Sequence, residues 1–104
     1  MLVNKGYADG DIVCFKLVTG DEVVAKIVNR SVEGDYIVNR PFTVISAQKG
    51  LGLMQSLISG EINTNVTLKG QHIIMHSLAV EEIAGHYIQT TTGIQPITRG
   101  KIIT

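Results

Sequence analysis

Short runs of β-branched and aromatic residues, separated by glycine-containing turns, recur along this sequence. Residues 12–18 and 23–28 form the first two runs, and only a few residues around Thr19-Gly20-Asp21 separate them. This order is typical of a strand, a tight turn and a second strand. Apolar or branched side chains alternate with polar ones most clearly over residues 61–68, the period expected of a strand with one buried face. The chain is therefore predicted to fold mainly as antiparallel β-sheet.

The middle of the chain predicts a bent strand followed by an apolar hairpin. Residues 36–45 form a third run, but Pro41 interrupts it and cannot donate a ladder hydrogen bond. Pro41 therefore marks an edge or a bulge where the strand bends. Residues 46–60 combine three glycines with large apolar side chains, which favours a hairpin that needs a partner surface. A last strand is predicted at residues 72–75, and bent strands of this kind suit a small barrel.

A short helix is predicted after the strands, over about residues 78–90. Apolar residues recur there at helical spacing, and Glu81 and Glu82 suit the positive N-terminal end of a helix. A chain of 104 residues is expected to form one domain. The predicted organisation is a flexible arm (residues 1–10), a barrel domain that includes the helix (11–95) and a C-terminal tail (96–104).

Charge and composition exclude several function classes. Nine acidic residues balance nine basic ones, so nucleic-acid binding would have to come from a local patch. No nucleophile, acid-base pair or phosphate-loop motif can be assembled, and we predict a protein that is not an enzyme and carries no cofactor. His72 and His76 would lie roughly 13 Å apart on a strand, which disfavours a metal site. The single Cys14 favours a reducing, cytoplasmic setting, and no segment is apolar for long enough to cross a membrane.

Two motifs carry a resemblance to a known family. Residues 15–27 (FKLVTGDEVVAKI) resemble the first Sm motif, and residues 35–39 (DYIVN) have its Asp-x-x-apolar-Asn spacing. Residues 68–75 (LKGQHIIM) resemble the second Sm motif, with Lys69 in place of arginine. In their order along residues 12–95, these pieces are similar to the Sm-like proteins carried by tailed phages, including phages of marine cyanobacteria.

This resemblance implies a small, strongly bent, five-stranded antiparallel Sm-like (SH3-like) barrel with a short C-terminal helix. Such subunits close into a homo-oligomeric ring by edge-strand pairing, and the two motif loops face the central pore. Asn39 would then read a base edge, Asp35 would hold Asn39, and Lys69 would line the pore. The full set of predicted RNA-binding residues is Asp35, Asn39, Arg40, Lys69, Gly70, Gln71 and His72. From the residues alone, Asp35 is equally well interpreted as the turn residue of a hairpin.

Two hypotheses follow for the function. The first is a non-enzymatic, ring-forming Sm-like protein that binds single-stranded RNA or acts as an RNA chaperone, in the host cytoplasm if a phage encodes it. The second is a structural or adaptor module that docks a protein partner through its barrel edge and the hairpin at residues 50–58. In a ring, each subunit need supply only one or two cationic residues to a shared pore, so a neutral chain is compatible with RNA binding.

Overall fold

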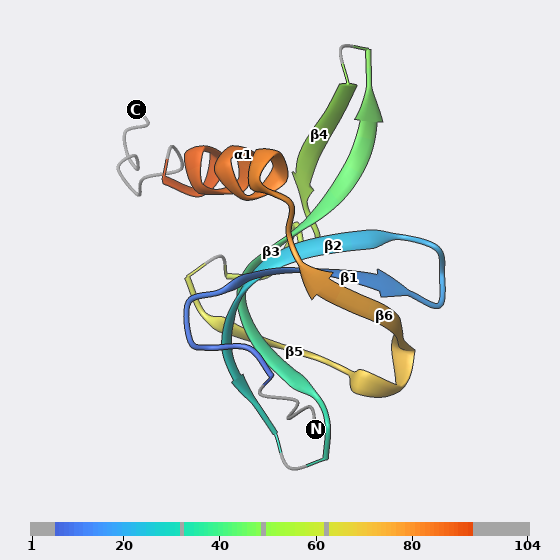
Figure 1. Cartoon of the computed structure of the whole chain (residues 1–104), viewed down its shortest axis with the longest axis vertical. Coiled ribbons are helices and arrows are strands. Elements are labelled where there is room, and N and C mark those ends of the chain that lie inside the picture. The colour runs from blue at the N-terminus through green and yellow to red at the C-terminus, as the bar shows by residue number, and fades with distance from the viewer. Residues whose placement is uncertain (1–5, 32, 49, 62, 93–104) are drawn as a thin grey trace, which may run out of the picture.

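The computed structural model describes residues 6–31, 33–48, 50–61 and 63–92 of the chain (Figure 1). Within these ranges there are six strands, one 3-10 turn and one α-helix. They are β1 (Ile12–Leu17), β2 (Glu22–Arg30), β3 (Tyr36–Ala47), β4 (Gly50–Gln55), β5 (Asn65–Leu68), η1 (Gly70–His72), β6 (Ile73–Leu78) and α1 (Glu81–Thr92). The predicted fold class, a mostly β, bent antiparallel sheet followed by a C-terminal helix, is confirmed.

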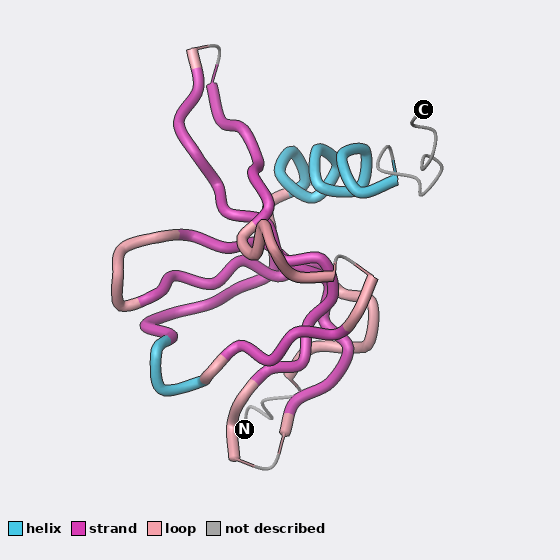
Figure 2. Tube along the Cα trace, turned by 180° about the vertical axis from the view of Figure 1, so that it is seen from behind, coloured by secondary structure: helices cyan, strands magenta, loops and turns pink. Residues whose placement is uncertain are grey.

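β3 is the strand that links the barrel to the projecting hairpin. The sheet runs in the order β4-β3-β2-β1-β6, and β5 pairs separately with the first part of β3. Residues 36–39 of β3 face β5, whereas residues 42–47 face β4. The first part of β3 therefore belongs to the barrel and the second part to a hairpin that projects from it, as the views from the front and from behind both show (Figures 1 and 2).

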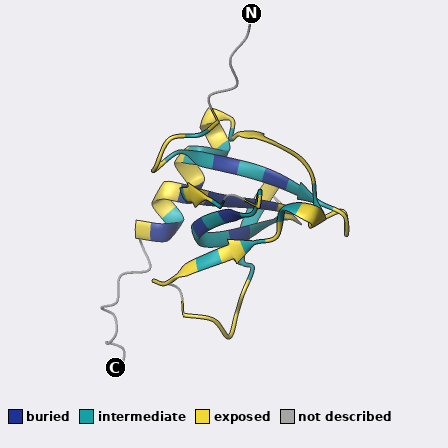
Figure 3. Ribbon diagram, turned by 90° about the horizontal axis from the view of Figure 1, so that it is seen from below, coloured by how far each residue is buried: buried dark blue, intermediate teal, exposed yellow. Residues whose placement is uncertain are grey.

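The two faces of the sheet bury two separate apolar clusters. Inside the barrel, Val13 and Phe15 of β1 pack with Ala25, Ile27, Tyr36 and Val38. On the opposite face, Val24 and Phe42 pack against Tyr87 of α1. Alternation along each strand supplies both clusters, because successive side chains point to opposite faces. Figure 3 shows this as buried bands that alternate with partly exposed ones along the strands.

β3 bends at Arg40, next to Pro41, where the sequence predicted a bend. Arg40 has a φ of 51°, in the left-handed region that side-chain-bearing residues rarely adopt. The Tyr87 hydroxyl lies 2.9 Å from Asn39 O and 2.8 Å from Arg40 O, so the two carbonyls at the bend share its one hydrogen. The helix thus holds the strained residue in place, because Tyr87 is only 1% exposed and cannot move away.

Several predicted boundaries differ from the structure. The helix begins at Glu81 instead of 78, because β6 continues to Leu78, which pairs with Val13. The last strand covers residues 73–78 instead of 72–75, and His72 belongs to η1. The predicted apolar hairpin supplies β4, so the described residues hold one strand more than the predicted five.

The predicted arm and tail are only partly described. Residues 1–5 of the arm and the whole tail, 96–104, lie outside the described residues. Within the arm, Tyr7 packs against the barrel through a 2.7 Å hydrogen bond between its hydroxyl and His76 Nδ1. Gly10 also donates its N–H to Ile27 O at 2.8 Å. In the described part of the chain, no helix is long and apolar enough to span a bilayer.

Candidate nucleic-acid interface

Two turns meet at one end of the β3–β5 pair, and Asp35 joins them. The turn between β2 and β3 is closed by Ser31, whose N–H donates to Asp35 O and whose Oγ accepts the Asp35 N–H. This fixes the Asp35 carboxylate at the start of β3. Its Oδ1 accepts the Gly70 N–H at 2.8 Å, and its Oδ2 accepts from Lys69 Nζ at 3.0 Å.

These contacts favour the charged form of Asp35. The hydrogen bond from the Gly70 backbone lowers the pKa of the Asp35 carboxyl from its ordinary value of 3.8, and the Lys69 ammonium lowers it further. The Asp35 side chain is 16% exposed, whereas the Lys69 side chain is 58% exposed. The Lys69 side chain is therefore accessible to solvent, and its ion pair with the less exposed Asp35 holds its ammonium in position.

Gly70 is required by the close approach of the two turns. A Cβ at this position would lie 2.4 Å from the Gly34 carbonyl oxygen, a distance that only a backbone shift could relieve. Its neighbours Gln71 and His72 are exposed on η1. The structure therefore brings together four of the predicted residues with Asp35, namely Lys69, Gly70, Gln71 and His72.

Asn39 and Arg40 lie at the other end of the β3–β5 pair. Asn39 is the register partner of Asn65, and its Nδ2 donates to Thr64 O at 3.3 Å. Arg40 donates from one terminal nitrogen to Asn63 Oδ1 at 2.8 Å and from the other to Thr91 O at 3.4 Å. Among the described residues, the buried Nε of Arg40 has no hydrogen-bond partner.

The expected pairing of Asp35 with Asn39 is therefore wrong. The two residues are four apart on an extended strand, which separates them by roughly 13 Å. Each side chain has partners of its own, so the seven predicted residues form two clusters. We call them the turn cluster (Asp35, Lys69, Gly70, Gln71 and His72) and the bend cluster (Asn39 and Arg40).

Sequence reasoning missed the residues that complete the bend cluster. A cavity of about 260 Å³ beside Arg40 is lined by Gln55, Thr64 and Asn65, among others. Tyr87 was not among the predicted site residues, yet its hydroxyl contacts the backbone carbonyls of both Asn39 and Arg40. Burial raises the pKa of Tyr87 to about 12, so the hydroxyl keeps its proton and remains a donor. The asparagines at 63 and 65 were available as a signal, because both lie on the polar face of the strand predicted at residues 61–68.

Comparison with known proteins gives similarity to solved structures alone. The chain matches no protein-family model, and no curated protein sequence matches it. Among solved structures it is similar to a heptameric archaeal Sm protein, with a TM-score of 0.48 and 11% sequence identity. The similar region covers 68% of this chain and 88% of the archaeal chain.

Proposed function

We propose that this chain is an Sm-like subunit of a homo-oligomeric ring that binds single-stranded RNA, of the kind that tailed phages carry. The observation that carries the proposal is the junction made by Asp35. It joins the two turns whose sequences resemble the Sm motifs, through Gly70 N–H and Lys69 Nζ. This contact gathers the exposed polar side chains of Lys69, Gln71 and His72 at one end of the barrel.

The open strand edges support ring formation. In the part of the chain that the structure describes, β5 pairs only with β3 and β6 pairs only with β1. Ile74, Met75 and Leu78 of β6 are 55%, 62% and 58% exposed. Unpaired edges with apolar side chains favour strand pairing with another chain, and a closed ring leaves no such edge open.

The turn cluster suits weak RNA binding that is repeated around a ring. Lys69 supplies one cation per subunit, and the adjacent Asp35 partly offsets it. Gln71 and His72 add exposed groups that can hydrogen-bond to bases or phosphates. Affinity would then come from several subunits that contact one strand, which reconciles RNA binding with a neutral chain. The bend cluster would add a second contact further along the β3–β5 pair.

The test is fluorescence anisotropy of labelled oligo(U) and oligo(A) at low salt, with micromolar protein. We expect binding that weakens several-fold in Lys69→Ala, with the oligomer intact. Lys16→Ala is the matched control, because Lys16 is also an exposed lysine beside a carboxylate, 3.6 Å from Glu22. The absence of any anisotropy change with the unaltered protein would rule out RNA binding.

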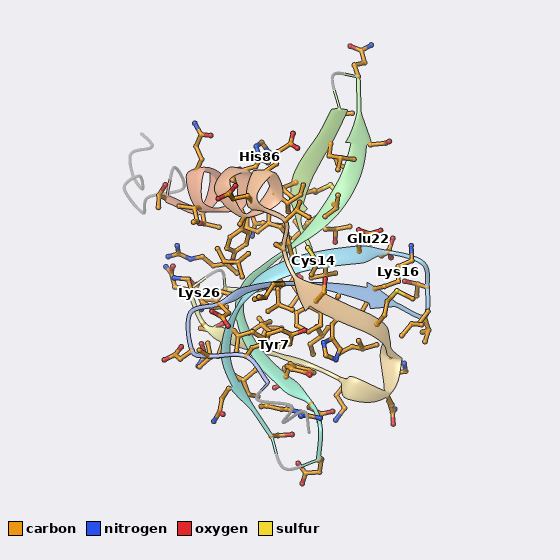
Figure 4. The ribbon with its side chains drawn as sticks, in the orientation of Figure 1. Tyr7, Cys14, Lys16, Glu22, Lys26 and His86 are labelled. Atoms are coloured by element: carbon orange, nitrogen blue, oxygen red, sulfur yellow. The ribbon has the colours of Figure 1, made fainter. Side chains whose placement is uncertain are left out.

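A second candidate function, an adaptor that docks a protein partner, is favoured by the projecting hairpin. Leu51, Met54, Leu57 and Ile58 of this region are 58%, 47%, 50% and 77% exposed. A groove of about 720 Å³ separates β4 from α1, and His86 lies on the helix side that faces the hairpin (Figure 4). Exposed apolar surface of this kind commonly marks an interaction site.

Deletion of residues 50–58 tests the adaptor function against the first. Loss of co-purifying protein partners, with oligo(U) binding retained, would favour the adaptor. Retention of all partners together with loss of RNA binding in Lys69→Ala would favour the RNA-binding ring.

A further inference from the structure

A second polar cavity lies at the end of β2, next to the β2–β3 turn and separate from the cavity beside Arg40. It has a volume of about 310 Å³ and is lined by the described end of the N-terminal arm, by the end of β2 and by Tyr36. The residues that matter for its chemistry are Tyr7, Asp9, Asn29, Arg30 and Tyr36. None of its lining residues belongs to β5 or β6, so ring formation through those edges leaves the cavity open.

Aromatic and guanidinium planes form one side of this cavity. The rings of Tyr7 and Tyr36 have centroids 6.4 Å apart and planes inclined by 51°. Tyr7 is fixed in turn by His76, and Figure 4 shows it within the curve of the barrel strands. The Arg30 guanidinium carbon lies 5.4 Å from the centroid of the Tyr36 ring. Tyr36 itself is only 6% exposed, so the surfaces left for an unpaired base to stack on are the partly exposed Tyr7 ring and the exposed Arg30 guanidinium.

The polar groups of the cavity have unused hydrogen-bonding capacity. Asn29 Oδ1 accepts the Arg30 N–H at 2.8 Å, which leaves the Asn29 Nδ2 as a donor. Within the described residues, neither the Asp9 carboxylate nor the Arg30 guanidinium has a hydrogen bond or an ion pair. The cavity therefore combines one anionic acceptor with an amide and a guanidinium donor.

We infer that this cavity binds a guanine base. Guanine carries N–H donors on one edge and the acceptors O6 and N7 on another. Asp9 can accept from the donor edge, while Arg30 and Asn29 can donate to O6 and N7. Adenine would place its N1 acceptor against the Asp9 carboxylate, which disfavours it.

A phosphate group is a poorer ligand for the same cavity. Asp9 balances the charge of Arg30, and Asp11 lies close by, since its Oδ2 accepts the Ala8 N–H at 2.9 Å. An anion would meet these carboxylates at a site with no net positive charge. The aromatic wall contributes nothing to phosphate binding but stabilises a planar base.

The guanine could belong to RNA or to a free nucleotide, and the first source rests on the proposed function. Arg30 is the register partner of Tyr36, which directly follows Asp35 of the turn cluster. The cavity and the turn cluster therefore flank the same β2–β3 turn. If a strand held at Lys69 runs along this turn, one of its bases can enter the cavity.

Calorimetric titration with GMP and AMP tests the inference. We expect GMP to bind at least about 10-fold more tightly than AMP, because one well-matched base edge gives discrimination of this size. Asp9→Asn and Arg30→Gln should each weaken GMP binding by about 5- to 150-fold, the range for one good base contact. Glu33→Gln is the control, because Glu33 is also exposed but lies outside the cavity. Equal binding of GMP and AMP, or no effect of Asp9→Asn on GMP, would overturn the inference.

A second arm separates the two sources of the base. If RNA supplies it, a single guanosine within oligo(U) raises affinity, and Asp9→Asn removes only that increase. If a free nucleotide supplies it, GMP binds with the stated selectivity and the added guanosine changes nothing. Failure of the proposed function has a different signature, since oligo(U) binding is then absent while GMP binding persists in Lys69→Ala.

Discussion

At the scale of single residues, the tightest approach in the turn cluster occurs where a side chain is absent. Gly70→Ala would place a Cβ 2.4 Å from the Gly34 carbonyl oxygen, which is backbone and cannot rotate away. We expect the two turns to separate and the free energy of unfolding to fall by about 1–3 kcal/mol. Urea denaturation measures this loss, and oligo(U) binding should weaken with it.

Gly85→Ala is the matched control for that substitution. Gly85 lies inside α1, and an added Cβ would meet no atom within 4 Å. Alanine is favoured over glycine inside a helix by about 1 kcal/mol, so this variant should be more stable than the unaltered protein. Equal effects of the two substitutions would contradict the steric argument for Gly70.

Tyr87 carries a second residue-scale prediction, at the bend of β3. Tyr87→Phe keeps the buried ring but removes the hydroxyl that donates to the carbonyls of Asn39 and Arg40. Since both carbonyls lose a donor at a strained backbone position, we expect a loss of about 1–3 kcal/mol in stability. Thermal and urea unfolding would measure it. Unchanged stability would mean that the bend does not depend on the helix.

Asp35 predicts a dependence of stability on acid. Its pKa in the folded protein is lowered below 3.8, chiefly by the Gly70 N–H. The folded state therefore favours the charged carboxylate more than the unfolded state does. The resulting stabilisation is fully present above pH 3.8. It is lost as the pH falls through the lowered folded value.

The measurement is the difference in urea midpoint between the unaltered protein and Asp35→Asn. This difference should be constant near neutral pH and should shrink below about pH 3.8, because the carboxylate becomes neutral. A difference that stays constant throughout the acid range would show that the charge of Asp35 does not stabilise the junction.

The candidate site shows what sequence reasoning at this scale could and could not place. Asp35, Lys69 and Gly70 were predicted from two motifs far apart in the chain, and the structure brings them into contact. Asn39 was assigned to the same group although it is four residues from Asp35. The rise of an extended strand already separates such residues by roughly 13 Å, as it does for His72 and His76. Motif spacing therefore has to be combined with the local backbone conformation.

At the scale of elements, β6 has a free edge through which the proposed ring could form. Ile74→Lys would place a charge among the exposed apolar residues of this strand, where a neighbouring strand is expected to pair. We expect the mass in light scattering to fall from a multiple of 11.3 kDa to that of the single chain. Val18→Lys is the control, because Val18 is similarly exposed, at 56%, but belongs to no strand. An unaltered protein that is already monomeric would contradict the ring.

The element boundaries show a limit of periodicity. The helix was predicted three residues early, because Val80 matches the helical spacing of apolar residues. In the structure Val80 belongs to the connection between β6 and α1. Leu78 pairs with Val13, and Ala79 donates its N–H to Ile12 O, so tertiary pairing decides where the strand ends. Pro41 correctly indicated a bend in β3. The sequence could not reveal that Tyr87, distant along the chain, would hold the neighbouring Arg40 in its unusual conformation.

At the scale of the whole molecule, the neutral charge of the chain has a structural counterpart. Two ion pairs are present within the described residues, Lys16 with Glu22 and Lys69 with Asp35. The cation of the turn cluster, Lys69, thus has a carboxylate beside it, and the chain has no net charge, so a single subunit would attract RNA only weakly. Assembly would change this by placing many weak sites around one axis.

The hairpin that projects from the barrel acquires a further property in such an assembly. Rotational symmetry repeats each hairpin in the same orientation relative to the axis, so the ring would carry a circular array of identical apolar hairpins. A partner with several matching sites would meet a high effective concentration after its first contact. Several hairpins that each bind with millimolar affinity could then hold such a partner tightly. Removal of the hairpin from a fraction of the subunits would weaken binding of the partner by more than that fraction.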